Sequence, residues 1–389
     1  MQTLQLHKDH SWQEHLVGIS ILLAFLLPHT SMLFQLVNPL LCLFLLYRFR
    51  KGRTWQPIVL FVLVPVILSI LFNFQNASLK AFQSTFTILL YFACFPFVGQ
   101  VHVRKFYLFF CLAYIFLSQI VYLLGMPRLT AFFDMVYPMS EENLDFYSHI
   151  QGNIGYSNVF AFRLGGIYHN PNQCARYLTM LMAFFLSVNH PKNVREVIYF
   201  ILIAYVGVLL TGSRTGFIIA SLIAYFGFLR HNRLSGFVRF TVVAIAFFGF
   251  FNILQGGTSL RALDIDSTGS ANLKWSTFMY YIHTEKSTLS YLLGHLDISL
   301  FNGGVGRVMN NFDSEYGELI FRFGFIGFFC FLIFYWSVAK RLPKSQWFFF
   351  IILLWMVSST IVASYRALFI FMLFLSVVYS NHYKSKDNS

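Results

Sequence analysis

Charged side chains are scarce in this sequence: Asp, Glu, Lys and Arg together make up 11% of its 389 residues. Hydrophobic residues make up 57% and aromatic residues 20%. A soluble globular domain typically carries about 25% charged residues. The shortage of charge therefore argues against an ordinary soluble globule. The long apolar stretches predict instead an all-α, polytopic membrane protein.

Cysteine is also rare, and all five cysteines lie in or beside apolar stretches (Cys42, Cys94, Cys111, Cys174 and Cys330). None stands in a long polar connection where a disulfide would help, and no His or Cys spacing suits a metal ion. The sequence also lacks low-complexity tracts, short repeats and a Gly-rich nucleotide loop. We therefore expect one integral membrane domain, residues 1–389, without disulfide framework, metal or cofactor.

Apolar runs predict about twelve transmembrane helices. A spanning helix needs about 20 apolar residues, because the hydrocarbon core is about 30 Å thick and a helix rises about 1.5 Å per residue. The first run leads directly into a second one, so we expect no cleavable signal peptide. The predicted spans fall near residues 14–28, 31–47, 57–74, 84–100, 106–124, 172–188, 197–211, 215–229, 240–255, 315–338, 346–363 and 366–381.

Basic clusters in alternate connections give the expected orientation, because Lys and Arg are enriched in cytoplasmic loops. Six clusters fall on one predicted side, which we assign to the cytoplasm together with both termini: Arg48/Arg50/Lys51/Arg53, Arg104/Lys105, Lys192/Arg195, Arg230/Arg233/Arg239, Lys340/Arg341/Lys344 and Lys384/Lys386. The formal net charge of +13 then falls entirely on this face. The excess of basic residues is thus explained by the orientation of the chain in the membrane, and we expect no binding of nucleic acid.

Only two connections are long, and both lie on the outer side. The first covers about residues 125–171 and the second about residues 255–314. Long loops on one face of a membrane scaffold are usually functional. We therefore look for the site at the outer face.

Arg214 interrupts an apolar run that is too long for a single crossing. Residues 197–229 would reach about 50 Å as one helix, so we predict two helices with Arg214 at the tip of the hairpin. Residues 347–379 repeat the arrangement, with Arg366 near the middle. An arginine at or inside the membrane is costly and marks a functional site by default.

Four helices that start at the outer face carry an arginine in their first turns. These arginines are Arg176, Arg214, Arg322 and Arg366. Free N–H groups and the dipole make a helix N-terminus suited to anions, and arginine binds phosphate with two parallel hydrogen bonds. The set predicts a site for an anionic substrate. Each arginine taken singly could instead be a snorkelling anchor, and Arg322 could be neutralised by Glu318 one turn away.

The expected helix starts carry capping residues. Asn170 is a good N-cap before Pro171, Ser213 or Thr215 can cap the helix of Arg214, and Asp313 or Ser314 can cap the helix that begins near Glu315.

The aromatic and histidine residues of these regions allow two interpretations. Trp275, Tyr280 and Tyr281 could stack on sugar rings or lie in an interfacial aromatic belt. His169, His283 and His295 lack metal-ligand spacing, and taken singly they fit polar loop residues better than catalysts, although His169 stands in the capping turn.

Several segments resemble O-antigen polymerases and ligases, in the same order and on the same side. The segment Arg163–Leu178 resembles the entry to a mid-chain span of that family, and Leu210–Phe217 (LTGSRTGF) resembles its hairpin motif. Lys274-Trp275, Leu293-Gly294-His295 and the stretch from Asp313 to Gly327 resemble its long outer loop and the following helix. The resemblance covers about residues 160–330. The arginine expected just before the loop tryptophan is absent at that spacing, so Lys274 or Arg261 would replace it.

The resemblance implies a glycosyltransferase of the bacterial inner membrane that acts on undecaprenyl-diphosphate-linked oligosaccharides at the periplasmic face, with both long loops periplasmic. Many ligases carry a histidine near the start of the helix after the long loop. This chain has Asp313-Ser314-Glu315 there, which favours a repeat-unit polymerase for O-antigen or a related surface polysaccharide. The alternatives are an O-antigen ligase, which transfers polymer to lipid A–core, and a transporter or flippase for lipid-linked sugars.

The expected site combines charge stabilisation of a leaving diphosphate with a base for the acceptor hydroxyl. We expect Arg214, Glu315 and Asp313 to be catalytic. The expected substrate-binding residues are Arg163, His169, Arg176, Arg261, Trp275, Arg307 and Arg366. Candidate partners are the lipid bilayer, the lipid-linked substrates, a chain-length regulator and a flippase.

Overall fold

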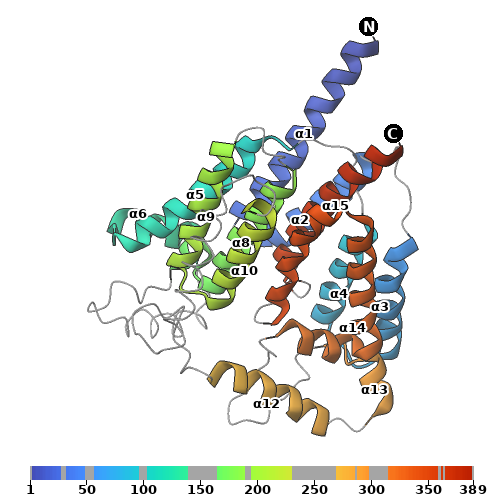
Figure 1. The fold of residues 1–389 in the computed structure, drawn as a ribbon. Helices are drawn as coiled ribbons and strands as arrows, with labels where there is room; N and C mark the ends of the chain where they lie inside the picture. The colour runs from blue at the N-terminus through green and yellow to red at the C-terminus, as the bar shows by residue number, and fades with distance from the viewer. Residues whose placement is uncertain are drawn as a thin grey trace. The chain divides into compact units, whose positions relative to one another are not determined.

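The computed structural model describes residues 2–27, 32–48, 57–95, 103–138, 164–188, 194–229, 269–284, 287–297, 314–357, 361 and 364–387. Every regular element among these residues is helical, which agrees with the predicted all-α class (Figure 1). The chain divides into two compact units, each built from segments distant in the sequence.

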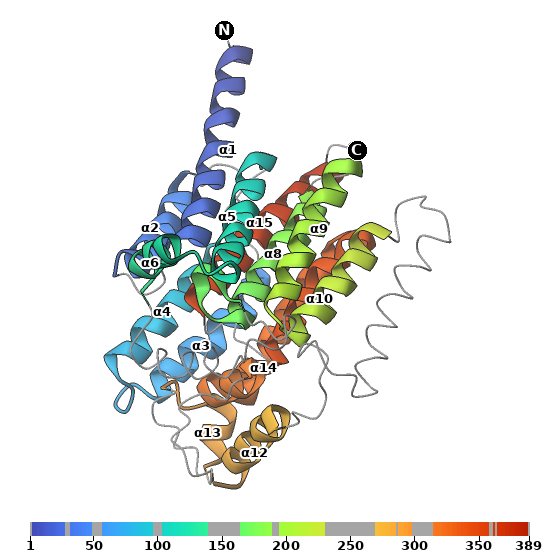
Figure 2. The same ribbon diagram turned by 90° about the vertical axis from the view of Figure 1, so that its left-hand side faces the viewer.

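The first unit contains residues 1–35, 102–267 and 345–352. The helices of this unit are α1 (Gln2–Leu26), α5 (Lys105–Leu123), α6 (Pro127–Val136), the 3-10 turn η2 (Gly166–Tyr168), α8 (Pro171–Val188), α9 (Val194–Leu210), α10 (Arg214–Ala224) and the π-helical turn η3 (Tyr225–Leu229). α5 packs against α1, α8 and α9, and α8 packs against α9 and α10. Figure 2 shows α8, α9 and α10 side by side.

The second unit contains residues 36–101, 268–344 and 353–389. The helices of this unit are most of α2 (Met32–Arg48), the 3-10 turn η1 (Pro57–Val59), α3 (Leu60–Phe72), α4 (Leu79–Ala93), α12 (Gly269–Thr284), α13 (Thr288–Leu293), α14 (Glu315–Arg341) and α15 (Tyr365–Asp387). α14 packs against α3 and α13, and α4 packs against α3 and α15.

A 3-10 helix, η6 (Lys344–Val357), stands where a transmembrane helix is predicted over 346–363. The 3-10 helix rises about 2.0 Å per residue against about 1.5 Å in an α-helix. Its 14 residues therefore reach about 28 Å, close to the thickness of a bilayer core.

Helices cover most of the described residues in the predicted spans, although the described Ile361 of the span 346–363 is a bend. The predicted span 240–255 lies outside the described residues. The first hairpin is confirmed, because α9 ends at Leu210 and α10 begins at Arg214. The described parts of the predicted long loops contain the α-helices α6, α12 and α13 and the 3-10 turn η2. Two helices of the described part, Lys105–Leu123 and Glu315–Arg341, are long and apolar enough to cross a membrane by length and composition.

α14 is broken at Gly324, where the sequence predicts one continuous span over 315–338. Gly324 has φ 66° and ψ −179°, a conformation open essentially to glycine alone. The break lets the N-terminal part of α14 turn against its C-terminal part, so the rings of Tyr316 and Phe328 lie 5.8 Å apart.

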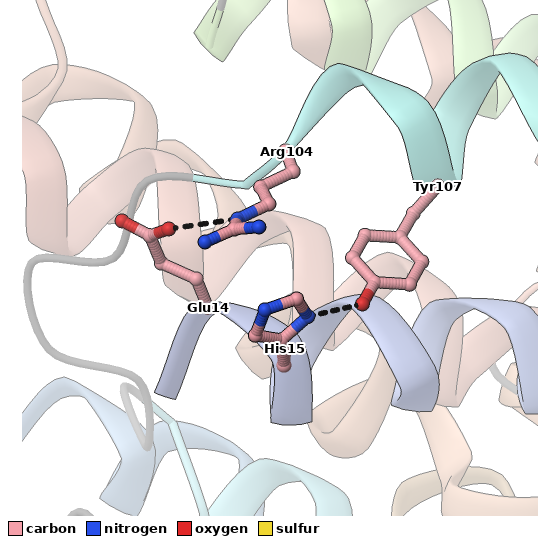
Figure 3. Close-up of polar contacts among 4 residues, drawn as sticks. All are labelled: Glu14, His15, Arg104 and Tyr107. Atoms are coloured by element: carbon pink, nitrogen blue, oxygen red, sulfur yellow. Dashed lines mark hydrogen bonds and ion pairs between the residues drawn. The ribbon is translucent and has the colours of Figure 1, made fainter. Parts of the chain in front are cut away.

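Two polar contacts join α1 to the start of α5 in the first unit (Figure 3). Arg104 Nε lies 3.3 Å from a carboxylate oxygen of Glu14, and His15 Nδ1 lies 2.6 Å from the hydroxyl of Tyr107. Gly18 also faces Tyr107, and a Cβ there would lie 2.2 Å from the ring. These contacts fix α1 against α5 at the end predicted to be cytoplasmic.

Candidate functional site

The N-terminus of α8 is capped as the sequence predicts. The side-chain oxygen of Asn170 accepts hydrogen bonds from the backbone N–H groups of Asn172, at 2.9 Å, and Gln173, at 3.3 Å. Pro171 occupies the first helical position, where its missing N–H has no cost. The remaining free N–H groups and the dipole make this end of α8 electropositive.

The N-terminus of α10 lies beside that of α8. Ser213 Oγ accepts a hydrogen bond of 3.3 Å from the backbone N–H of Gly216, which confirms Ser213 as the cap. A Cβ on Gly216 would lie 2.7 Å from the Cβ of Ala175, so the first turns of the two helices are in close contact. Two electropositive helix ends thus meet at one end of the first unit.

The turn that leads into α8 is fixed to α5 and α9. The backbone N–H of Leu164 donates to the carbonyl of Leu210 at 3.0 Å. Gln119, which is buried in α5, donates from Nε2 to the carbonyls of Leu164 and Gly207 at 3.1 and 3.0 Å. Ser118 Oγ accepts from the backbone N–H of Ile167 at 3.2 Å. Ser118 and Gln119 could not be predicted as site residues, because nothing in the sequence distinguishes them from other polar residues in an apolar helix.

His169 has a structural role in this turn. Its Nε2 donates to the backbone carbonyl of Tyr137 at 2.5 Å, and its φ of 54° is unusual for a residue other than glycine. The adjacent Tyr168 donates from its hydroxyl to the carbonyl of Phe25 at 2.9 Å. The two contacts hold the turn in place, which favours the structural interpretation of His169.

Arg176 is buried in the second turn of α8, with 1% of its surface exposed. Its guanidinium lies 5.1 Å from the centroid of the Tyr177 ring, and Nη2 donates to the hydroxyl of Tyr177 at 3.3 Å. The rings of Tyr177 and Tyr168 are 4.6 Å apart. The aromatic contacts orient a buried positive charge within the first turns of α8.

Several predicted site residues are described only in part. Arg214 is the first residue of α10, next to the Ser213 cap, but its side chain lies outside the described residues. The same holds for the side chain of Trp275, which belongs to α12. Arg163, Arg261, Arg307 and Asp313 lie wholly outside them, although Arg163 directly precedes Leu164 of the turn.

Glu315 and Arg366 belong to the second unit. Glu315 is fully buried, and its Oε2 accepts a hydrogen bond of 2.7 Å from the backbone N–H of Ile361. Arg366 is the second residue of α15 and is buried as well. Ser314 occupies the N-cap position of α14, but its hydroxyl contacts the carbonyl of Met356 at 3.4 Å and makes no capping bond. The capping role predicted for Ser314 is therefore wrong.

Arg322 forms the predicted ion pair with Glu318. Its Nη2 lies 2.9 Å from Glu318 Oε1, and its Nη1 donates to Ser84 Oγ at 3.2 Å. Both side chains of the pair are about 10% exposed (11% and 10%), so the charges are compensated where water is scarce. Of the four arginines at helix starts, Arg322 thus fits the structural interpretation.

Tyr281 packs in a hydrophobic cluster and offers no surface to a sugar. It is 2% exposed, and its ring centroid lies 5.2 Å from that of Phe321 in α14. Tyr280 packs against the same cluster. The described residues contain no group of three or more His, Cys, Asp or Glu side chains that could hold a metal ion.

No protein-family model matches this chain, and comparisons with curated proteins and with solved structures find no significant match either.

Proposed function

We propose that this chain is a membrane glycosyltransferase that joins undecaprenyl-diphosphate-linked oligosaccharide repeat units into O-antigen or a related surface polysaccharide. In this proposal the chain crosses the bacterial inner membrane about twelve times, with both long loops in the periplasm. The sequence motifs around residues 160–330 supply the resemblance on which the reaction class rests.

The observation that carries the proposal is the meeting of two helix N-termini in the first unit. α8 and α10 touch at Ala175 and Gly216, one turn from their caps, and a buried Arg176 lies beside them. Arg214 opens α10 at the same end. An arginine at a helix N-terminus is unfavourable alone, because both are positive, and becomes favourable when an anion lies between them. A diphosphate suits this arrangement.

The proposed reaction needs charge stabilisation more than acid catalysis. The acceptor hydroxyl oxygen forms a bond to the anomeric carbon of the donor glycan, and the bond from that carbon to the phosphate oxygen breaks. Undecaprenyl diphosphate leaves with the electron pair, and the hydroxyl proton passes to a base. Arg214 stabilises the departing diphosphate in this scheme, and the charge of the buried Arg176 adds to the positive potential at the N-terminus of α8.

The break in α14 bears on the transporter alternative, because transporters bind substrates at discontinuous helices. The carbonyls of Phe321 and Arg322 at this break accept backbone N–H groups of His295, at 2.7 Å, and Leu296, at 3.0 Å. Ser69 Oγ also donates to the Arg322 carbonyl at 2.9 Å. The carbonyls freed by the break are thus satisfied by the protein itself, which favours the enzyme over the transporter.

Reporter fusions test the twelve-span layout. Fusions at Gly152 and Gly257 should report the periplasm, and fusions at Arg233 and Lys344 should report the cytoplasm, because the basic clusters are retained inside. Paired alkaline phosphatase and fluorescent protein fusions measure this directly. A cytoplasmic signal at either long loop would remove the proposed substrate from the site.

Deletion of the gene from its host distinguishes the polymerase from the ligase. Without the polymerase, lipid A–core should carry at most one repeat unit, because ligation continues while chain growth stops. Gel separation of lipopolysaccharide would show the loss of the long ladder. Bare core with long polymer left on undecaprenyl diphosphate would instead establish a ligase and contradict our proposal.

A further inference from the structure

The short helix α6 presents an exposed row of apolar side chains. Leu129, Phe132 and Met135 recur every third residue, so they lie on one side of the helix. They are 46%, 49% and 74% exposed. The opposite side carries the polar residues Thr130 and Asp134. α6 is thus amphipathic, with its apolar side uncovered by the described part of the chain. Arg128, in the first turn, also lies on this side, where its long side chain can extend to the headgroups.

α6 is held firmly against the end of α5. Asp134 Oδ1 accepts a hydrogen bond of 2.6 Å from the hydroxyl of Tyr122, near the last residue of α5. The buried Phe133 packs against Tyr114, Tyr122 and Tyr137, with ring centroids 6.0 to 6.5 Å apart. These contacts fix which side of α6 faces the protein, so the exposed row is a stable feature of the first unit.

The position of α6 along the chain indicates what covers this row. In the described part of the chain, α5 is one of two helices long and apolar enough to cross a membrane, and it ends at Leu123. Gly125, with φ 58°, turns the chain, and α6 starts at Pro127. Figures 1 and 2 both show α6 running sideways from the end of α5. A helix that begins within four residues of the end of a span lies at the level of the membrane–water interface.

We propose that α6 is an interfacial helix whose Leu129–Phe132–Met135 row inserts into the bilayer, at the end of the first unit where α8 and α10 begin. The carbonyl of Tyr137, just after α6, accepts the hydrogen bond from His169 in the turn before α8. The bilayer contact therefore sets the depth of that turn, and with it the depth of the two helix N-termini. This inference rests on α5 crossing the membrane and does not depend on the proposed reaction.

Spin labels on the full chain test the proposal. Cys330, the one free cysteine that is not buried, is replaced by alanine, and single cysteines are introduced as Phe132→Cys, Met135→Cys, Thr130→Cys and Leu117→Cys. The labelled chains are placed in vesicles of phosphatidylethanolamine and phosphatidylglycerol. Collision rates with oxygen report hydrocarbon, and those with a water-soluble nickel chelate report water. Cys330→Ala without an added cysteine provides the blank for the four buried cysteines.

Labels at 132 and 135 should collide with oxygen and be protected from nickel, as should the label at 117 on the lipid-exposed side of α5. The label at 130, on the polar side of α6, should collide with nickel at least several times more often. Equal nickel access at 130, 132 and 135, with 117 still protected, would overturn the inference for α6. Nickel access at 117 as well would show that α5 does not cross the membrane, and would so remove the premise of the inference.

Discussion

Replacing Arg214 by alanine should abolish polymer formation while the amount of protein in the membrane stays near normal. Arg214 opens α10 beside the Ser213 cap, where the N-termini of α8 and α10 meet. Loss of one positioned charge at a developing anion typically costs 10²–10³-fold or about 3–4 kcal/mol. The helix itself should tolerate alanine, because alanine is the best helix former. Gel analysis of lipopolysaccharide and immunoblots of membranes measure both quantities.

Arg214→Lys should recover little activity, because an ammonium group cannot reproduce the two parallel hydrogen bonds of a guanidinium. Arg104→Ala is the matched control. Arg104 pairs with Glu14 at the other end of α5, where both side chains are partly exposed (Figure 3). An exposed ion pair contributes about 0–1 kcal/mol, so this variant should make normal polymer. Full activity in Arg214→Ala would exclude that residue from the site.

Replacing Gly324 by alanine should strongly reduce the yield of folded protein. Its φ of 66° with ψ −179° is strained for any side chain, at about 1–3 kcal/mol. A Cβ there would also lie 2.1 Å from the backbone carbonyl oxygen of Leu292, which cannot move without shifting α13. The packing of α13 against the break in α14 should therefore be lost. Size-exclusion profiles and thermal unfolding of the purified protein in detergent measure the effect.

Gly125→Ala separates backbone strain from steric clash. Gly125 also has a positive φ, of 58°, but a Cβ there would meet no atom within 4 Å. Strain of about 1–2 kcal/mol without a clash should lower the unfolding temperature by only a few degrees. Equal behaviour of the two variants would contradict the close approach of α13 to Gly324.

The features that could be predicted from the sequence are those that local chemistry controls. Asn170 with Pro171 predicts the start of α8, because the side chain and the ring satisfy the helix end without any tertiary contact. The length of the 197–229 run requires the turn at residues 211–213, since a single helix would exceed the bilayer. Glu318 and Arg322 pair because helix geometry places residues four apart side by side.

Which of these residues meet, and which are buried, depends on how distant helices pack in the folded chain. The contact of Gly216 with Ala175, which joins the N-termini of α8 and α10, links positions about 40 residues apart and depends on how two helices pack. The break at Gly324 could not be predicted, because a glycine in an apolar helix has no distinct sequence signature. In the structure, the backbone N–H groups of His295 and Leu296 donate to carbonyls at this break. By sequence, Tyr281 could either stack on a sugar or pack in a hydrophobic core. Its burial against Phe321 places it in the core, because burial depends on the fold and not on the residue type alone.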